Sequence, residues 1–177
     1  MGMTIQLDAV GGIAGDMFVA AMVDALPALR GRVLADAAAV LPAGIGTPML
    51  EAGMSAGLRC LRFGLAAPEA ASHRHDHAHS AFRDMVARIE AATLAEGTAA
   101  QAVAILRHLA VAEAAIHGVA VEDVHFHEIG DWDSLMDVTA AGSIAAALSG
   151  AAWSVSELPR GGGFVRTRHG VLPVPVP

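Results

Sequence analysis

The sequence predicts an α/β fold in which helices pack on a small mixed sheet within a single domain of 177 residues. Three observations support this prediction. Short segments near both ends of the chain alternate apolar and polar residues, which is typical of strands. Longer segments between them carry apolar residues at helical spacing. A long helical crossover between the strands expected near residues 4–8 and 153–157 favours parallel pairing of the two.

The composition excludes several classes of protein. A net charge of -7 argues against non-specific nucleic-acid binding. The single cysteine, Cys60, allows no internal disulfide and fits a reducing compartment. No basic segment precedes an apolar one as in a secretion signal, and no apolar run reaches the roughly 20 residues of a membrane span. We therefore expect a cytoplasmic protein that binds neither nucleic acid nor membranes.

The chain opens with an expected strand over residues 4–8, which runs into a loop containing three glycines and then a helix over 16–26. A strand, a glycine loop and a helix in this order point backbone N–H groups at an anion, usually phosphate. The loop matches neither a Walker motif nor Gly-x-Gly-x-x-Gly. Asp8, at the end of the strand, is a candidate metal ligand or general base. The alternative is a tight turn with Asp16 capping the helix.

A second helix is expected over residues 30–40, after Pro27 ends the first. Two short strands then follow, at about 48–54 and 57–65, with Ser55-Ala56-Gly57 between them. A hairpin is the simplest structure for this pattern.

Residues 66–79 are expected to form a mobile linker, because the segment is polar and lacks periodicity. Four histidines alternate along it and would project to one side of an extended chain. Histidine-rich tracts bind nickel, copper or zinc with low specificity. The alternative is a solvated loop without a metal role, and the two interpretations are compatible. The four residues are His73, His75, His77 and His79.

Helical periodicity resumes after the linker, first in the apolar series Phe82, Met85, Val86 and Ile89. Thr98 and Gln101 predict a capping box at the start of a second helix, which runs to about His117 with Gly118 at its C-cap. A third, small-faced and buried helix is expected over residues 133–148.

Residues 124–137 hold two imidazoles and as many as four carboxylates in an otherwise apolar chain. His125 and His127 lie at i and i+2, so in an extended segment they point the same way and Phe126 points the opposite way. Glu128 adds a carboxylate next to this pair. Nitrogen and oxygen ligands brought together in this way suit a divalent metal such as nickel, zinc or manganese.

The second half of this segment is expected to begin a helix, with Asp131 as its N-cap. Asp133 and Asp137 lie at i and i+4 and would share one helix face. The alternative is purely structural: acidic residues near a helix N-terminus complement its dipole, and either histidine is then packed or exposed without a ligand role.

The chain closes with an expected strand over 153–157, a second glycine loop over 159–165 and a polyproline-like run over 169–177. Such an end is typical of the first part of a longer protein. Three arginines near the second loop suit an anionic ligand, and they are Arg160, Arg166 and Arg168.

Together these motifs resemble the nickel insertion proteins of the lactate racemase cofactor pathway (LarC type). The opening resembles the family in Leu7-Asp8-Ala9 and in Gly12-Ile13-Ala14-Gly15-Asp16-Met17-Phe18. The centre resembles it in Ala112-Glu113-Ala114, Ile116-His117-Gly118, Val124-His125-Phe126-His127-Glu128-Ile129-Gly130, Asp133-Ser134 and Asp137. The later part resembles it in Gly161, Gly163-Phe164-Val165, His169-Gly170, Leu172-Pro173 and Pro175. The likeness extends over essentially the whole chain, and a histidine-rich insert is also typical of the family.

The resemblance implies a nickel chelatase or cyclometallase of the lyase class. Such proteins insert nickel into a pyridinium-3,5-bisthiocarboxylic acid mononucleotide, using CTP with magnesium or manganese, to make a nickel-pincer nucleotide. The resemblance makes residues 1–177 the N-terminal domain of such a protein. The C-terminal domain, linked with CTP and oligomer formation, is absent from this sequence and is expected as a further domain or subunit.

The resemblance and the ligand logic together give three sets of candidate residues. The catalytic candidates are Asp8, Asp16, Glu128 and Asp133. The metal-binding candidates are His125, His127, Glu128, Asp137, His73, His75, His77 and His79. The substrate-binding candidates, which would take the mononucleotide phosphate, are Gly11, Gly12, Gly15, Gly161, Gly163 and His169.

Two other functions remain open on the sequence alone. One is a metal-dependent hydrolase that acts on a phosphate ester through Asp8 and the His-Glu pair. The other is a non-catalytic nickel carrier that binds through the histidines of residues 73–79.

Overall fold

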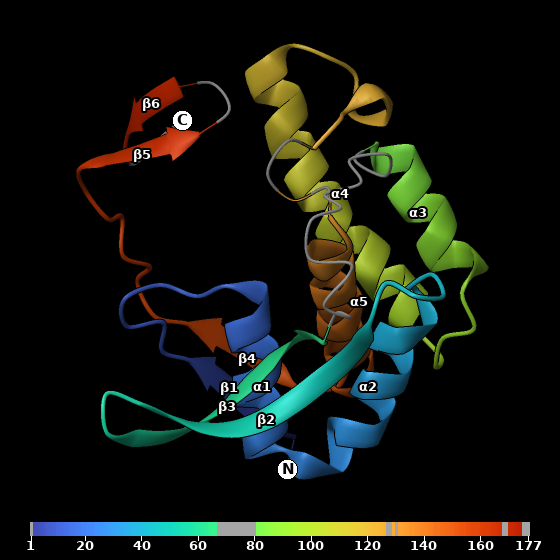
Figure 1. The fold of residues 1–177 in the computed structure, drawn as a ribbon, viewed down its shortest axis with the longest axis vertical. Coiled ribbons are helices and arrows are strands. Elements are labelled where there is room, and N and C mark those ends of the chain that lie inside the picture. Colours follow the sequence, from blue (N-terminus) through green and yellow to red (C-terminus); the bar gives the residue numbers. More distant parts are fainter. Residues whose placement is uncertain (1, 67–80, 127–128, 130, 168–169, 175–177) are drawn as a thin grey trace. The chain divides into compact units, whose positions relative to one another are not determined.

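The computed structural model describes residues 2–66, 81–126, 129, 131–167 and 170–174 (Figure 1). Among these residues the chain divides into two compact units, one formed by residues 1–13 with 150–177 and the other by residues 14–149. Both helices and strands are present, so the predicted α/β class is confirmed. The described strands form three two-stranded sheets, one parallel and two antiparallel, in place of the one mixed sheet expected.

The first unit joins the two ends of the chain through a parallel strand pair. Strand β1 (Thr4–Leu7) pairs with β4 (Ala152–Val155), with Leu7 opposite Val155. The Ser156 N–H donates to the Leu7 carbonyl at 2.9 Å, which continues the ladder one residue past β4. The predicted pairing of these two strands is confirmed.

The first unit also holds an antiparallel hairpin that the sequence did not predict. Strand β5 (Phe164–Thr167) pairs with β6 (Gly170–Pro173). The glycine loop expected over 159–165 is present over residues 159–163, but Phe164 and Val165 already belong to β5. The polyproline-like run expected over 169–177 was wrong over Gly170–Pro173, which form β6. Each strand is only four residues long and lies among glycines and prolines, so the alternation that marks a strand is too short to recognise.

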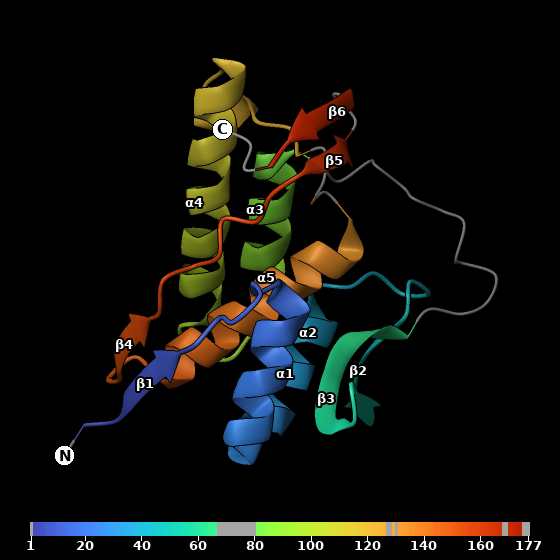
Figure 2. The same ribbon diagram turned by 90° about the vertical axis from the view of Figure 1, so that its left-hand side faces the viewer.

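The second unit contains the helices and a long hairpin. Its elements are α1 (Gly15–Ala25), η1 (Pro27–Leu29), α2 (Arg30–Ala39), β2 (Thr47–Ser55), β3 (Leu58–Ala66), α3 (Phe82–Ala91), α4 (Thr98–His117), η4 (Val121–Asp123) and α5 (Trp132–Ala147). Helix α1 packs on β3 and α2 packs on β2, whereas α3 and α4 run side by side in both views (Figures 1 and 2). The predicted helices and the predicted hairpin are thus confirmed, with ends shifted by a residue or two.

The hairpin turns through Ala56 and Gly57, whose φ angles are 48° and 81°. Positive φ at both central residues gives a turn whose twist matches that of the strands. Leu50 and Phe63 lie opposite each other in the ladder and are both buried, which fixes the inward face of the hairpin.

Helices α4 and α5 approach each other closely where Gly142 meets Ala102. A Cβ atom on Gly142 would lie 2.6 Å from the Ala102 nitrogen, so no larger residue fits without a shift. The core beside this crossing is apolar and buried, and its large members are Phe82, Met85, Ile89, Leu106, Phe126, Trp132 and Leu135.

A buried carboxylate ties α2 to the helices around it. Asp36 is 3% exposed, and its carboxylate accepts hydrogen bonds from the Ala95 N–H at 2.8 Å, the Thr98 hydroxyl at 2.8 Å and the Ser143 hydroxyl at 2.6 Å. The predicted capping box was wrong, because the Thr98 side chain bonds to Asp36 and makes no cap bond. Gly97, in the left-handed region at φ 81°, is the N-cap of α4.

Among the described residues, α4 is the one helix long and apolar enough, by length and composition, to cross a membrane. Core helices pass the same test, and α4 packs against both α3 and α5.

Replacing Asp36 by Ala is expected to destabilise the fold by about 2–4 kcal/mol, because three buried donors lose their acceptor. Urea denaturation would measure this change. Asp24→Ala is the control, since Asp24 pairs with Arg59 at 2.9 Å on the surface, with 39% of the Asp24 side chain exposed, and should matter far less. A loss at position 36 no larger than at position 24 would contradict the role given to the network.

Replacing Gly142 by Ala is expected to destabilise the fold by about 1–2 kcal/mol, because the clash with α4 outweighs the better helix propensity of alanine. Gly31→Ala in α2 is the matched control, since an added Cβ there meets nothing within 4 Å. That variant should gain up to about 1 kcal/mol. Thermal denaturation of both proteins tests whether the two changes have opposite signs.

Candidate functional site

A pocket of about 400 Å³ lies within the first unit, where β1 and β4 end. Parallel pairing brings the loops that follow both strands to the same end of the sheet, which is where α/β sheets commonly bind ligands. The volume lies in the usual range of small-molecule sites, about 300–1,000 Å³. Its lining residues are Asp8, Ala9, Val10, Gly11, Ser156, Glu157, Leu158, Pro159 and Arg160.

One hydrogen bond joins the two loops and another closes the first of them. The Ala9 N–H donates to the Ser156 side-chain hydroxyl at 3.2 Å, and within the first loop the Gly12 N–H donates to the Ala9 carbonyl at 3.1 Å. Gly11 and Gly12 have φ angles of 86° and 108°, which side chains rarely allow. The predicted glycine loop is therefore a tight turn, and its sequence places glycine where the backbone requires it.

The polar side chains of this pocket are of mixed charge. Asp8 and Glu157 contribute carboxylates, and Arg160 contributes a guanidinium. The apolar side chains of Val10 and Leu158 are 85% and 53% exposed, so they are open to contact with a ligand. Gly161 and Gly163 follow Arg160 along the chain and are not among the lining residues.

The described first part of the histidine motif, residues 124–126, has the extended geometry that its sequence predicts. Val124 and Phe126 are each 2% exposed, whereas His125 between them is exposed. A β-bridge joins His125 to Ala81, and the His125 Nδ1 lies 3.1 Å from the Asp123 carbonyl oxygen. The two buried neighbours thus anchor the segment and present the imidazole to solvent.

Several candidate ligands lie outside the described residues. They are His127, Glu128, His169 and the four histidines of the expected mobile linker, His73, His75, His77 and His79. Within the described part of the chain, no group of three or more His, Cys, Asp or Glu side chains is placed to hold a metal ion. The ligand set predicted for nickel therefore remains a prediction.

The start of α5 carries an acidic cluster that also involves α1. The Asp131 carboxylate accepts from the Ser134 N–H at 2.9 Å, so the predicted N-cap is confirmed. Partial burial raises the pKa of Asp133, and the carboxylates of Asp131 and Asp16 raise it further. Three of the four candidate aspartates, Asp16, Asp133 and Asp137, are therefore close enough to influence one another.

Asp137 is the most perturbed group of this cluster. Burial, followed by the charges of Asp133 and Asp16, raises its pKa to about 7, although the Asp16 N–H acts in the opposite direction. Its Oδ1 is buried and has no hydrogen-bond partner among the described residues. A Cβ atom on Gly15 would lie 2.7 Å from its Oδ2, so glycine at the start of α1 permits this approach. Gly15, a substrate-binding candidate, therefore lies against the Asp137 carboxyl group.

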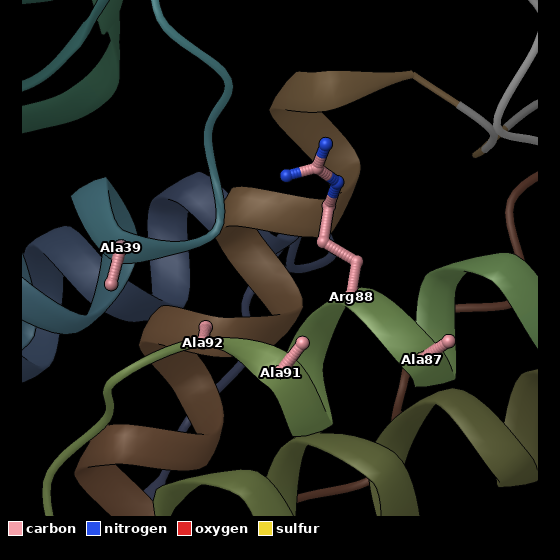
Figure 3. A pocket seen from close by; sticks show the side chains of 5 residues that line it. All are labelled: Ala39, Ala87, Arg88, Ala91 and Ala92. Carbon is pink, nitrogen blue, oxygen red and sulfur yellow. The ribbon is translucent and has the colours of Figure 1, made fainter.

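A second pocket, of about 420 Å³, is lined by four alanines and Arg88 (Figure 3). The Arg88 guanidinium lies 4.9 Å from the centre of the Trp132 ring and donates to the Val40 carbonyl at 3.3 Å. These contacts already engage its charge, and no candidate site residue lines this pocket. It is the weaker candidate for a ligand site.

Ser156 and Glu157 are the polar lining residues that the sequence interpretation missed. They are the first two residues after β4, and the signal that identifies them is their position after a strand that pairs in parallel with β1.

Asp137→Asn is expected to stabilise the protein by about 1–2 kcal/mol at pH 8, a value reduced from the full shift because the side chain is only half-buried. The pKa of Asp137 is about 7 in the folded protein, against an ordinary value of 3.8. Between these two pH values the carboxyl group ionises in the unfolded chain but not in the folded one, so the free energy of unfolding of the parent falls as pH rises. At pH 4 the two proteins should be equally stable. Urea denaturation at both pH values, with Glu90→Gln on the exposed face of α3 as control, measures the difference.

Curated proteins similar to this chain carry related names. A protein of Geobacter metallireducens, "Putative nickel insertion protein", is 40% identical over 175 residues, and the match covers 98% of this chain and 43% of that protein. A protein of Nocardioides sp., "Pyridinium-3,5-bisthiocarboxylic acid mononucleotide nickel insertion protein", is 35% identical over 175 residues, with 98% and 42% covered. The chain thus spans less than half the length of these relatives. No solved structure matches it.

The model of one protein family, described as nickel insertion protein, matches residues 5–177. That match takes in the glycine turn, the histidine motif and both strands that frame the pocket. On this evidence the chain belongs to the nickel insertion protein family.

Proposed function

We propose that this chain takes part in inserting nickel into a pyridinium-3,5-bisthiocarboxylic acid mononucleotide. The observation that carries the proposal is the family match across residues 5–177, supported by the relative named for that substrate. Nickel is then a substrate of the reaction, and the mononucleotide is its acceptor. The product is a nickel-pincer nucleotide of the kind that lactate racemase-type enzymes use.

The histidine motif is the proposed nickel site. His125, His127 and Glu128 supply two imidazoles and a carboxylate, a ligand set suited to nickel. The exposure of His125 and the burial of its two neighbours support this role, because a ligand needs both access to the metal and a rigid anchor. The histidines of residues 73–79 are proposed to collect nickel ahead of transfer.

The acidic cluster is the proposed proton acceptor. Nickel must displace protons from its ligands, and a nickel–carbon bond to the pyridinium ring requires that the ring C–H proton leave to a base. Asp137 has a pKa near neutrality, so it can accept a proton at physiological pH. Asp133 and Asp16 are its neighbours in this role.

The pocket at the ends of β1 and β4 is the proposed site of the mononucleotide. Arg160 would bind the phosphate, because a guanidinium donates paired hydrogen bonds to such oxygens. Gly11 leaves room for the ligand at the turn, and Asp8 lies in the same pocket. The other residues proposed to bind the mononucleotide are Gly12, Gly15, Gly161, Gly163 and His169.

The finer features implied by the resemblance belong to this proposal as well. They are dependence on CTP with magnesium or manganese, membership of the lyase class, a cytoplasmic location and assembly into an oligomer. We propose that CTP binds to the further domain or subunit that accounts for the greater length of the relatives.

Replacing His127 by Ala is expected to weaken nickel binding at least about tenfold, because a direct ligand is lost. The measurement is calorimetry with nickel on a background in which His73, His75, His77 and His79 are serine, which removes the low-affinity sites. His108→Ala is the control, since His108 is exposed on α4. Equal affinity of the His127 variant and its parent would assign a structural role to the motif.

Nickel binding to the same background is expected to weaken as pH falls through about 6.5, because imidazole must lose its proton to bind a metal. Titrations at pH 7.5 and 5.5 test this expectation. Binding that is unchanged at the lower pH would mean that carboxylates hold the metal.

A further inference from the structure

We infer that Arg83 and Asp123 are positioning residues for the imidazole of His125, and that they present its Nε2 atom, with Nδ1 protonated, as the atom that binds nickel. The inference rests on the proposed function, because it specifies how one ligand of the proposed nickel site is oriented. Neither Arg83 nor Asp123 belongs to the motifs or the candidate residues given above.

The start of α3 runs antiparallel to the segment that follows η4. A β-bridge joins Ala81 to His125, and the Phe82 N–H donates to the Val124 carbonyl at 3.0 Å. Phe82 and Val124 are both buried, so this central pair enters the core, whereas His125 faces solvent. The main chain on either side of the imidazole is therefore fixed by bonds to a helix start.

An ion pair continues this arrangement by one more residue on each side. The Arg83 guanidinium donates to the Asp123 carboxylate, and the two side chains are 64% and 60% exposed. The Asp123 N–H in turn donates to the Ala120 carbonyl at 2.9 Å, which closes η4. Asp123 is thus held through both its side chain and its main chain, on the exposed side where His125 also lies.

The contact between Asp123 and His125 determines which nitrogen of the imidazole carries the proton. The His125 Nδ1 lies 3.1 Å from the Asp123 carbonyl oxygen, which is within hydrogen-bond distance. A carbonyl oxygen can only accept, so Nδ1 must be the donor. In a neutral imidazole the free lone pair is then on Nε2. Histidines that bind metals commonly donate their other N–H to a carbonyl or a carboxylate, which orients the ring.

The alternative is an ordinary surface ion pair, which contributes little to stability. The two interpretations predict opposite effects for the loss of Arg83. If only charge mattered, removing a positive charge near the site would tighten the binding of a cation. If the ion pair orients His125 through Asp123, removing it weakens that binding.

Calorimetry with nickel distinguishes the two, on the background in which residues 73, 75, 77 and 79 are serine. Arg83→Gln is expected to weaken nickel binding about three- to fivefold, less than the roughly tenfold or more that loss of a buried outer partner costs, because this pair is exposed. Arg83→Lys should restore the affinity to within about twofold, since a single N–H contacts the carboxylate and an ammonium can replace it.

Arg107→Gln is the matched control. Arg107 lies 4.0 Å from Glu122 in the same turn, η4, and the two side chains are 58% and 55% exposed. The substitution removes the same charge from a similar ion pair without touching Asp123. Nickel affinity should therefore be unchanged or slightly tighter. Circular dichroism confirms that each variant is folded.

NMR of protein with isotope-labelled histidine rings measures the tautomer directly. In the metal-free parent at pH 7.5, His125 is expected to carry its proton on Nδ1, and zinc, a diamagnetic substitute for nickel, should shift the Nε2 resonance. The fraction with the proton on Nε2 should rise in Arg83→Gln and stay at the parent level in Arg107→Gln. Loss of the signals in His125→Gln assigns them.

Nickel binding by Arg83→Gln that is as tight as in its parent, or tighter, overturns the inference. A metal-free His125 whose proton lies on Nε2, or whose tautomer does not respond to the loss of Arg83, also overturns it. The proposed function is judged separately. The expected tautomer and its dependence on Arg83, without nickel binding by the parent, refute the nickel site alone, whereas nickel binding with His125 in the other tautomer refutes only this inference.

Discussion

The second unit depends on the buried carboxylate of Asp36. Three donors from residues 95, 98 and 143 converge on it, and Arg32 lies 4.0 Å away. A buried carboxylate is tolerated only when its oxygens are satisfied, so these bonds fix how α2, the start of α4 and the middle of α5 meet. The acidic cluster lies on the same α5, and this network therefore sets the position from which Asp133 and Asp137 project.

Small residues let the helices approach one another closely enough for this arrangement. Gly142 permits α5 to touch the backbone of α4, and Gly15 permits the Asp137 carboxylate to lie against the start of α1. Only 4% of the chain is aromatic, and small residues such as Ala102, Ala110 and Ala114 accompany the larger side chains in the core. The close contact at Gly15 also keeps water from Asp137, and the loss of water is the main cause of its raised pKa.

Local sequence signals predicted most of the elements, and distant contacts account for what they missed. Three features could be predicted: the alternation of Val124, His125 and Phe126, the glycine turn, and the parallel pairing of β1 with β4. Each depends on a local sequence pattern or on the tendency of a long helical crossover to connect parallel strands. The role of Thr98 could not, since its hydroxyl bonds to Asp36, 62 residues away, in preference to its own helix. Glu157 could not be predicted either, since its place in the site depends on the pocket that the loop after β4 forms with the loop after β1.

The parallel pairing of β1 with β4 has a consequence for the order in which the protein assembles. The hydrogen bond from Ala9 to Ser156 spans 147 residues, so a nascent chain cannot form the first unit until nearly all of the present sequence has been synthesised. Bringing such distant segments together costs loop-closure entropy, which increases only slowly with the length of the loop. Contacts between distant segments also slow the folding reaction. Residues 14–149 make up the second unit and can fold within that interval, which shortens the flexible distance between the two strands. The pocket at the ends of β1 and β4 can thus appear only late in synthesis, and a chain cut short within α5 would retain the start of the acidic cluster and the β2–β3 hairpin but could form neither the β1–β4 pair nor the pocket beside it.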